Sequence, residues 1–411
     1  MSPDDLDPPA TPQRREPLNE RTLLKLLAAI SALGPIATNL YLPALPDVRA
    51  DFDASVAAVQ TTFSISLVTF ATGILVWGPI SDRYGRRTAV LSGLAIMIAG
   101  TLLNLVAPTL GWLIAGRGIQ AFGTAAGLVV ARAIVTDRFP ADRIARTLAG
   151  LTMASVLGNS LAPTAGGYLV AGFGWRSVFA VLSLVAVVVV IAAWRGLPES
   201  PPHAGRPPRV REMLATARRL LRDPLFAHCI VQSTVVYAIF FVFISLSPHV
   251  MVDALGRGST EFGPYYLFVA VGYFLGNWSV GRFASSRGQQ WMVSTGLTLQ
   301  VAAAMTALAL VLARVDHPLA LFVPLGVLAY GQGLTLPGVT ATAVSLTQEH
   351  VGVASSIVGF LPQLIGALAL QGMGYFPTDT ALPMMVFCTA VAVIGYWVLR
   401  LAPRFDVVRA Q

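Results

Sequence analysis

The sequence predicts an all-α membrane protein with twelve transmembrane helices in two six-helix halves. Hydrophobic residues make up 55% of the 411 residues and charged residues only 12%, against about 25% charged in average proteins. Apolar segments long enough to cross a hydrocarbon layer about 30 Å thick recur along the chain. A hydrophilic stretch at 196–225 divides them six and six. These observations argue against a soluble globular enzyme.

The elements follow in order from the first residue. Residues 1–20 are polar and proline-rich, so we expect a disordered cytoplasmic tail. We place the spans at 22–45, 57–79, 88–107, 110–131, 147–170, 177–195, 226–250, 262–283, 290–313, 318–343, 352–375 and 381–401. The two halves then cover 21–195 and 226–401, and 402–411 forms a second cytoplasmic tail. The central loop, 196–225, ends in a basic piece that is either an amphipathic helix on an anionic leaflet or a solvated linker.

The positions of the basic residues predict the topology. With the N-terminus inside, the cytoplasmic segments carry 23 of the 28 Lys and Arg residues and the outer loops carry four. This asymmetry follows the positive-inside rule, so we expect both termini in the cytoplasm. It also explains the net charge of +8 without nucleic-acid binding. A single Lys beside 27 Arg residues indicates a GC-rich bacterial genome, and hence a bacterial inner membrane.

The loop between the second and third spans, Gly78–Arg87, combines one acid, several arginines and two glycines. Gly85 permits the positive φ of a tight reversal. Further charges follow at the inner end of the fourth span, and we expect a latch between the halves. Solvated charge pairs are the alternative. The predicted latch comprises Gly78, Asp82, Arg83, Gly85, Arg86, Arg132 and Asp137. A related stretch at 276–288 indicates a weak internal repeat that has lost the acid.

Four stretches resemble a known family. The spacing Gly-x-x-x-Asp-Arg-x-Gly-Arg-Arg in 78–87 resembles the loop 2–3 signature of the major facilitator superfamily. Residues 41–46 resemble the end of the first span in its Bcr/CflA group of drug efflux proteins. Residues 117–123 resemble the helix 4 motif, and 158–167 the helix 5 motif associated with antiporters, with Ala162 in place of the usual Gly. The resemblance implies the major facilitator fold, with Asp82 against the inner end of helix 11, near 352–356.

The fifth span combines small residues with a proline. Gly158, Gly166 and Gly167 let neighbouring helices approach closely, and Pro163 removes a backbone hydrogen bond. This pattern predicts a pliable hinge between the halves. Close packing without hinge motion is the alternative.

Arg117 lies inside the fourth span, about 10 Å from its outer end. An intramembrane arginine usually faces the bundle interior and has a partner. No Asp or Glu falls inside a predicted span. Asn39 lies at the matching depth of the first span, where the Bcr/CflA pattern has an acid. We therefore expect Arg117 to bond Asn39, which cannot titrate, and this departure puts proton coupling at the site in question.

Other polar and aromatic residues inside the spans are candidates for a substrate cavity. Besides Asn39 and Arg117, we select Tyr41, Gln120, Asn159, Gln232 and Tyr237. Asn277, Gln300, Gln332 and Gln363 are weaker candidates. Interhelical hydrogen bonds or contact with lipid are the alternatives. The two cysteines have no metal-site spacing, and the sequence has no nucleophile–base pair or phosphate loop. We expect no metal, no cofactor and no enzyme activity.

These features together predict a secondary transporter that works by alternating access. The resemblance implies export of small lipophilic drugs, amphenicol-like or bicyclomycin-like, by proton antiport. One alternative is a metabolite exporter or facilitator without strict proton coupling, and another is a non-transporting sensor or scaffold. The expected partners are a small-molecule substrate, protons and the lipid bilayer, and we expect a monomer. With one arginine and no acid in the spans, the cavity should prefer neutral or weakly anionic drugs to permanent cations.

Overall fold

The computed structural model describes residues 19–197, 210–347 and 351–401, and the regular elements in those ranges are helical. The first part contains α1 (Glu20–Asn39), η1 (Leu42–Ala44), α2 (Leu45–Asp51), α3 (Val56–Tyr84), α4 (Arg86–Leu105), α5 (Leu110–Arg138), α6 (Ala141–Phe173) and α7 (Arg176–Gly196). The second contains α8 (Val210–Leu220), α9 (Pro224–Asp253), α10 (Ser259–Arg287), α11 (Gln289–Leu312), α12 (Pro318–Ser345), α13 (Val351–Met373) and α14 (Leu382–Leu401). The tails expected at 1–20 and 402–411 lie almost wholly outside the described residues.

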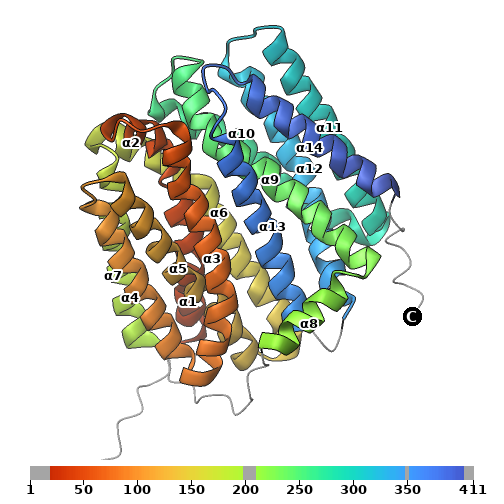
Figure 1. Ribbon diagram of the computed structural model, residues 1–411. Coiled ribbons are helices and arrows are strands. Elements are labelled where there is room, and N and C mark those ends of the chain that lie inside the picture. The colour runs from red at the N-terminus through yellow and green to blue at the C-terminus, as the bar shows by residue number, and fades with distance from the viewer. Residues whose placement is uncertain (1–18, 198–209, 348–350, 402–411) are drawn as a thin grey trace, which may run out of the picture.

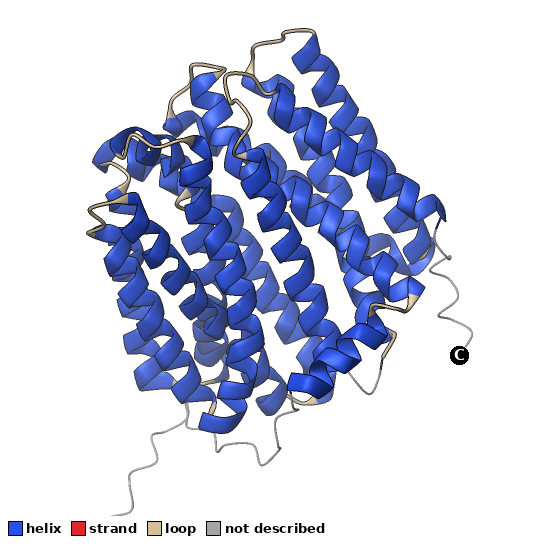
Figure 2. Ribbon diagram, viewed as in Figure 1, coloured by secondary structure: helices blue, strands red, loops and turns tan. Residues whose placement is uncertain are grey.

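Each predicted span corresponds to a long helix (Figure 2). The first span differs most, because α1 ends at Asn39 and the chain continues through η1 into the short helix α2. Pro43 and Pro46 occupy the first turns of η1 and α2, where a missing N–H is tolerated. Among the described residues, ten helical stretches are long and apolar enough to cross a membrane. The long helices α6 and α10 fall outside that set.

The helices of the two halves pack by one scheme (Figure 1). In the first half, α3 and α4 pack on α5, α1 packs on α6, and α4 on α7. In the second half, α10 and α11 pack on α12, α9 packs on α13, and α11 on α14. Gly85, with φ of 91°, reverses the chain between α3 and α4, and Gly288, with φ of 78°, does so between α10 and α11. The packing therefore supports the repeat inferred from 276–288.

Glycines at the helix crossings bring backbones into direct contact. A Cβ atom added to Gly100 of α4 would lie 2.3 Å from the backbone nitrogen of Gln120 on α5. One added to Gly276 of α10 would lie 2.2 Å from the carbonyl oxygen of Tyr330 on α12. Any larger residue would push these helices apart, so each half is a tightly interlocked bundle.

The two halves meet along two helix pairs, α3 with α13 and α6 with α10. We call this boundary the seam. The α6–α10 pair is very close, because a Cβ atom on Gly263 would lie 2.3 Å from the Cα atom of Thr164. The seam has two ends, the α2 end and the α8 end, named after the short helices beside them (Figure 1).

Candidate functional site

A cavity of about 300 Å³ lies between the halves, about midway along the long helices. The first half contributes residues of α1, α3, α5 and α6, and the second contributes residues of α9, α10, α12 and α13. Ligand sites span about 300–1,000 Å³, so the volume suits one small molecule. A site shared by two halves changes shape whenever the halves move.

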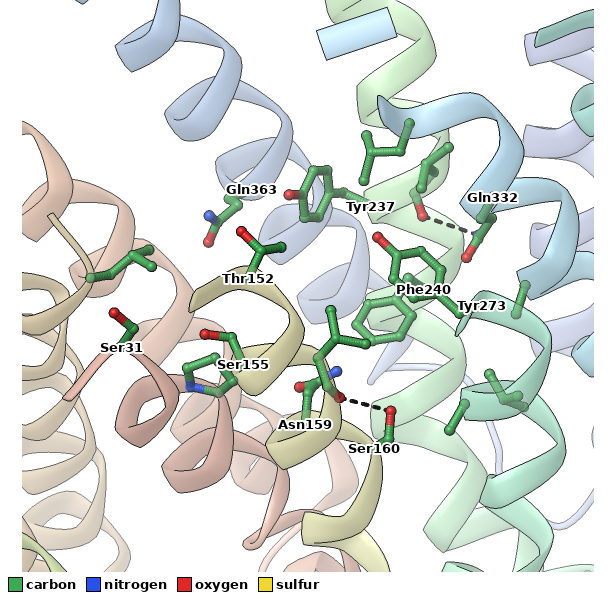
Figure 3. A pocket seen from close by; sticks show the side chains of 18 of the residues that line it. Ser31, Thr152, Ser155, Asn159, Ser160, Tyr237, Phe240, Tyr273, Gln332 and Gln363 are labelled. Carbon is green, nitrogen blue, oxygen red and sulfur yellow. Dashed lines mark hydrogen bonds between the residues drawn. The ribbon is translucent and has the colours of Figure 1, made fainter. Parts of the chain in front are cut away.

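The walls of the cavity differ in character (Figure 3). Figure 3 shows polar side chains of α6, including Ser155 and Asn159, across from aromatic side chains of α9 and α10. The aromatic residues of the wall include Tyr237, Phe240, Tyr266 and Tyr273, and the amide residues are Asn159, Gln332 and Gln363. An apolar wall with a few polar groups is typical of small-molecule sites.

Arg132 of α5 is the charged residue among the described side chains that line the cavity, and no Asp or Glu is among them. We expected Arg132 to belong to the latch. It does not belong to the hydrogen-bonded cluster that Arg86 forms with Asp82 and Asp137. The α-helical register explains the difference, because Arg132 and Asp137 are five residues apart and point to different sides of α5.

The predicted latch contains a real charge cluster, centred on the buried side chain of Arg86. Its Nε donates to Oδ2 of Asp137 at 2.8 Å, and its Nη1 donates to Asp82 and, at 2.9 Å, to Oγ of Ser81. These residues lie on α3, α4 and α5, all in the first half. Asp82 makes its described hydrogen bond to Arg86, four residues away, rather than to 352–356 at the start of α13. A role in joining the halves therefore stays a prediction.

The other latch residues occupy the same end. Arg83 stacks over the ring of Tyr84, 5.3 Å from its centroid. A Cβ atom on Gly78 would meet nothing within 4 Å. This face of α3 is therefore open rather than packed.

An ion pair joins the halves at the α2 end. Arg49 of α2 donates from Nη1 and Nη2 to the two carboxylate oxygens of Asp253 on α9, at 2.6 and 2.9 Å. Thr378, in the turn before α14, also donates to Asp253. His249 lies one turn before Asp253 and is fully buried, and neither ring nitrogen has a hydrogen-bond partner. The sequence alone does not predict this pair, because its members are 204 residues apart.

Polar side chains of α3 make further hydrogen bonds between the halves near the α2 end. Oγ of Ser64 donates to Oε1 of Gln371 on α13 at 2.7 Å, and Nε2 of Gln371 donates to the carbonyl of Ala57 at 3.0 Å. Nε2 of Gln60 donates to the carbonyl of Ser245 on α9 at 3.2 Å. Together with Arg49–Asp253, these bonds hold the seam shut at the α2 end.

Arg117 is buried against the first helix, as expected, with 1% of its surface exposed. Its Nη1 donates to Oε1 of Gln120 at 2.7 Å and to the carbonyl of Ala37 at 3.2 Å, and the guanidinium lies over the ring of Tyr41, 4.6 Å from the centroid. The expected bond to Asn39 is wrong. Ala37 lies in the last turn of α1, where carbonyls lack helical partners, and it takes the guanidinium instead.

Asn39 is paired elsewhere. Its Nδ2 donates to the carbonyl of Pro35 at 2.9 Å and to Oδ1 of Asn159 on α6. Asn159 and Tyr237 line the cavity, as predicted, whereas Asn39 reaches it through Asn159. Gln232 donates to the carbonyl of Gly395 at 2.9 Å and ties α9 to α14. Tyr41, Arg117, Gln120 and Gln232 are not among the described residues that line the cavity. Gln332 and Gln363, the weaker candidates, do line it.

The fifth-span motif packs closely on the first helix. A Cβ atom on Gly166 would lie 2.1 Å from the carbonyl oxygen of Leu40, and one on Gly158 would lie 2.8 Å from the side chain of Ile36. Pro163 lies inside α6, which continues past it to Phe173. The close approach is therefore present, and hinge motion at 158–167 stays a prediction.

Comparison with known proteins places this geometry in context. Residues 27–370 match the family model of the Major Facilitator Superfamily. An uncharacterized MFS-type transporter of Bacillus subtilis is 28% identical over 374 residues, covering 90% of this chain and 92% of the relative. A bicyclomycin resistance protein homolog of Haemophilus influenzae is 26% identical, covering 91% and 94%. A chloramphenicol resistance protein of Pseudomonas aeruginosa is 27% identical, covering 90% and 88%.

Solved structures agree on the fold. A bacterial homolog of the human lysosomal transporter Spinster, in an inward-facing and unoccupied conformation, superposes with a TM-score of 0.73 at 19% identity. The alignment covers 93% of this chain and 97% of that one. A D-xylose–proton symporter gives a TM-score of 0.73 at 13% identity, covering 93% and 98%. The arrangement of helices is therefore shared with both structures.

Proposed function

Because the chain belongs to the major facilitator superfamily, we propose that it exports small lipophilic drugs by alternating access. The observation that carries the proposal is the cavity of about 300 Å³, lined by aromatic and amide side chains from both halves. The substrate class is supported by two relatives named for resistance to bicyclomycin and to chloramphenicol. We assign both termini to the cytoplasmic side of a bacterial inner membrane on the placement of the basic residues. A monomer stays an expectation.

In this orientation the α2 end faces outward and the α8 end faces the cytoplasm. The cross-half hydrogen bonds described above all lie at the α2 end, which corresponds to a state that takes up drug from the cytoplasm. Export then requires that Arg49–Asp253 and the Gln60, Ser64 and Gln371 bonds break while the α8 end closes. Asp82, freed from Arg86, is the group that would meet the start of α13 in the closed form.

A second candidate, export without strict proton coupling, is favoured by one observation. No Asp or Glu is among the described residues that line the cavity, and Asn39 occupies the position of the Bcr/CflA acid. An amide cannot carry a proton between the two sides. The drug and the proton therefore have no shared carboxylate in the described part of the cavity.

Transport into inverted membrane vesicles tests both candidates. Vesicles that contain the protein should accumulate chloramphenicol more than vesicles from cells without it. Dissipating the pH gradient separates the candidates, since antiport stops and uncoupled export persists. Equal accumulation with and without the protein, across amphenicols and bicyclomycin, would refute drug export.

A further inference from the structure

We propose that Arg132 makes the cavity a binding site for drugs that carry an acidic group, with its guanidinium as their counter-ion. This inference rests on the proposed export function and names its substrate class. It starts from the charge inventory of the cavity wall. The described lining includes one guanidinium and no carboxylate, and Arg132 makes no hydrogen bond or ion pair with any side chain that the structure describes.

A charge in a low-dielectric site is costly unless it has a partner. The two buried arginines of the described residues have one. Arg117 is covered by Gln120, Ala37 and the ring of Tyr41. Arg86 is held by two carboxylates. Arg132 differs from both, since it is exposed and lines a cavity that a ligand can fill.

The position of Arg132 suits capture from the cytoplasm. It lies six residues, or about 9 Å, before the end of α5 at the α8 end. The cavity-lining part of α6, Leu151–Ser160, begins about 15 Å from the start of that helix. A molecule that enters from the α8 end thus passes Arg132 before it reaches Asn159.

The opposite wall defines the rest of the ligand. Tyr237 on α9 lines the same cavity as Arg132. Phe240, Tyr266 and Tyr273 continue the aromatic surface from that point. Figure 3 shows Tyr237, Phe240 and Tyr273 side by side across from α6. The ligand class is therefore a small apolar or aromatic body with one acidic group at its end, which the planar guanidinium can bind with two parallel hydrogen bonds.

The test uses two ligands with one scaffold. Chloramphenicol is neutral, and chloramphenicol hemisuccinate adds a single carboxylate. Binding of both is measured on the purified full-length protein in lipid nanodiscs, for the wild type and for Arg132→Gln, Arg132→Lys and Arg314→Gln. Arg314 is an exposed residue of the turn before α12, remote from the cavity, and serves as a matched loss of charge.

We expect Arg132→Gln to weaken hemisuccinate binding at least tenfold and to change chloramphenicol binding less than threefold. Arg132→Lys should retain part of the preference, because it keeps the charge without the planar fork. Arg314→Gln should behave as the wild type. Unchanged neutral binding also verifies that the Arg132→Gln protein is folded.

Two outcomes overturn different claims. If the wild type binds chloramphenicol but Arg132→Gln leaves hemisuccinate binding intact, or weakens both ligands equally, the role of Arg132 is refuted and drug binding stands. If the wild type binds neither compound, the proposed drug site itself fails, and the inference fails with it.

Discussion

The ion pair at the α2 end gives a sharp prediction about the conformational equilibrium. Asp253→Asn keeps the shape of the side chain and removes its charge. In the wild type the two Arg49–Asp253 bonds measure 2.6 and 2.9 Å, and the side chains are 30% and 17% exposed. The substitution should therefore weaken the closure without creating a cavity.

The size of the effect follows from the strength of charged hydrogen bonds, which contribute about 1.5–3 kcal/mol. Because the pair is partly exposed, we take about 2 kcal/mol, and a tenfold change corresponds to about 1.4 kcal/mol. The ratio of open to closed molecules at the α2 end should rise roughly 30-fold. If closed molecules outnumber open ones by 99:1 in the wild type, the variant would then contain a substantial open population.

Pulsed electron paramagnetic resonance measures this ratio directly. Spin labels at Asp53→Cys and Asp379→Cys, two exposed turn positions in different halves, report the separation of the α2 ends. Glu261→Gln is the control, because Glu261 pairs with Arg257 in the same half, at 3.6 Å and with about 40% exposure. An unchanged distance distribution in Asp253→Asn, or the same shift in Glu261→Gln, would refute the assignment of this pair as a closure.

Four further predictions follow from the same contacts. Asp82→Asn should lower transport in inverted vesicles while drug binding and membrane insertion persist, and full transport would contradict a latch. Arg117→Ala should lower the melting temperature more than Arg117→Lys, since each buried partner left unsatisfied costs about 1–3 kcal/mol. Gly166→Ala should destabilise the folded protein by about 1–3 kcal/mol through overpacking. Gly172→Ala is the control, because an added Cβ atom there meets nothing within 4 Å. Equal melting temperatures of the two variants would refute the crowding at Gly166. Asn39→Asp places a titratable group beside the cavity and should make vesicle uptake more sensitive to the pH gradient. Unaltered sensitivity would contradict a role of position 39 in proton coupling.

The existence and order of the long helices could be predicted from the sequence because apolar length is a local property of the chain, whereas boundaries such as the end of α1 at Asn39 could not. The chain reversal at Gly85 could be predicted too, since positive φ is a property of one residue. The partner of Arg117 could not. Sequence gives the depth of a residue in a span, and Arg117 and Asn39 share a depth, but it does not give the rotation of each helix about its axis. That rotation brings the Ala37 carbonyl and the Tyr41 ring to Arg117.

The remaining site residues depend on contacts between distant segments. Arg49 and Asp253 each lie just beyond the end of a predicted span, where the sequence does not distinguish them from other charged loop residues. Arg132 sits at the end of its span, beside the charges of the latch. The helical register puts it on a different side of α5 from Asp137 but does not say which side faces the cavity. Only the packing of α5 against its neighbours turns one toward the cavity and the other toward Arg86.

The glycine crossings bear on how such a protein diversifies. At Gly100 and Gly276 a side chain would collide with the backbone of the next helix, so amino-acid substitution at these positions would disrupt the packing. The wall of the cavity faces empty volume, and its side chains can change without moving a helix. New substrate specificities can therefore arise by substitution of a few wall residues, without a change in the packing of the helices. Relatives only 26–28% identical over nearly the whole chain are compatible with such divergence.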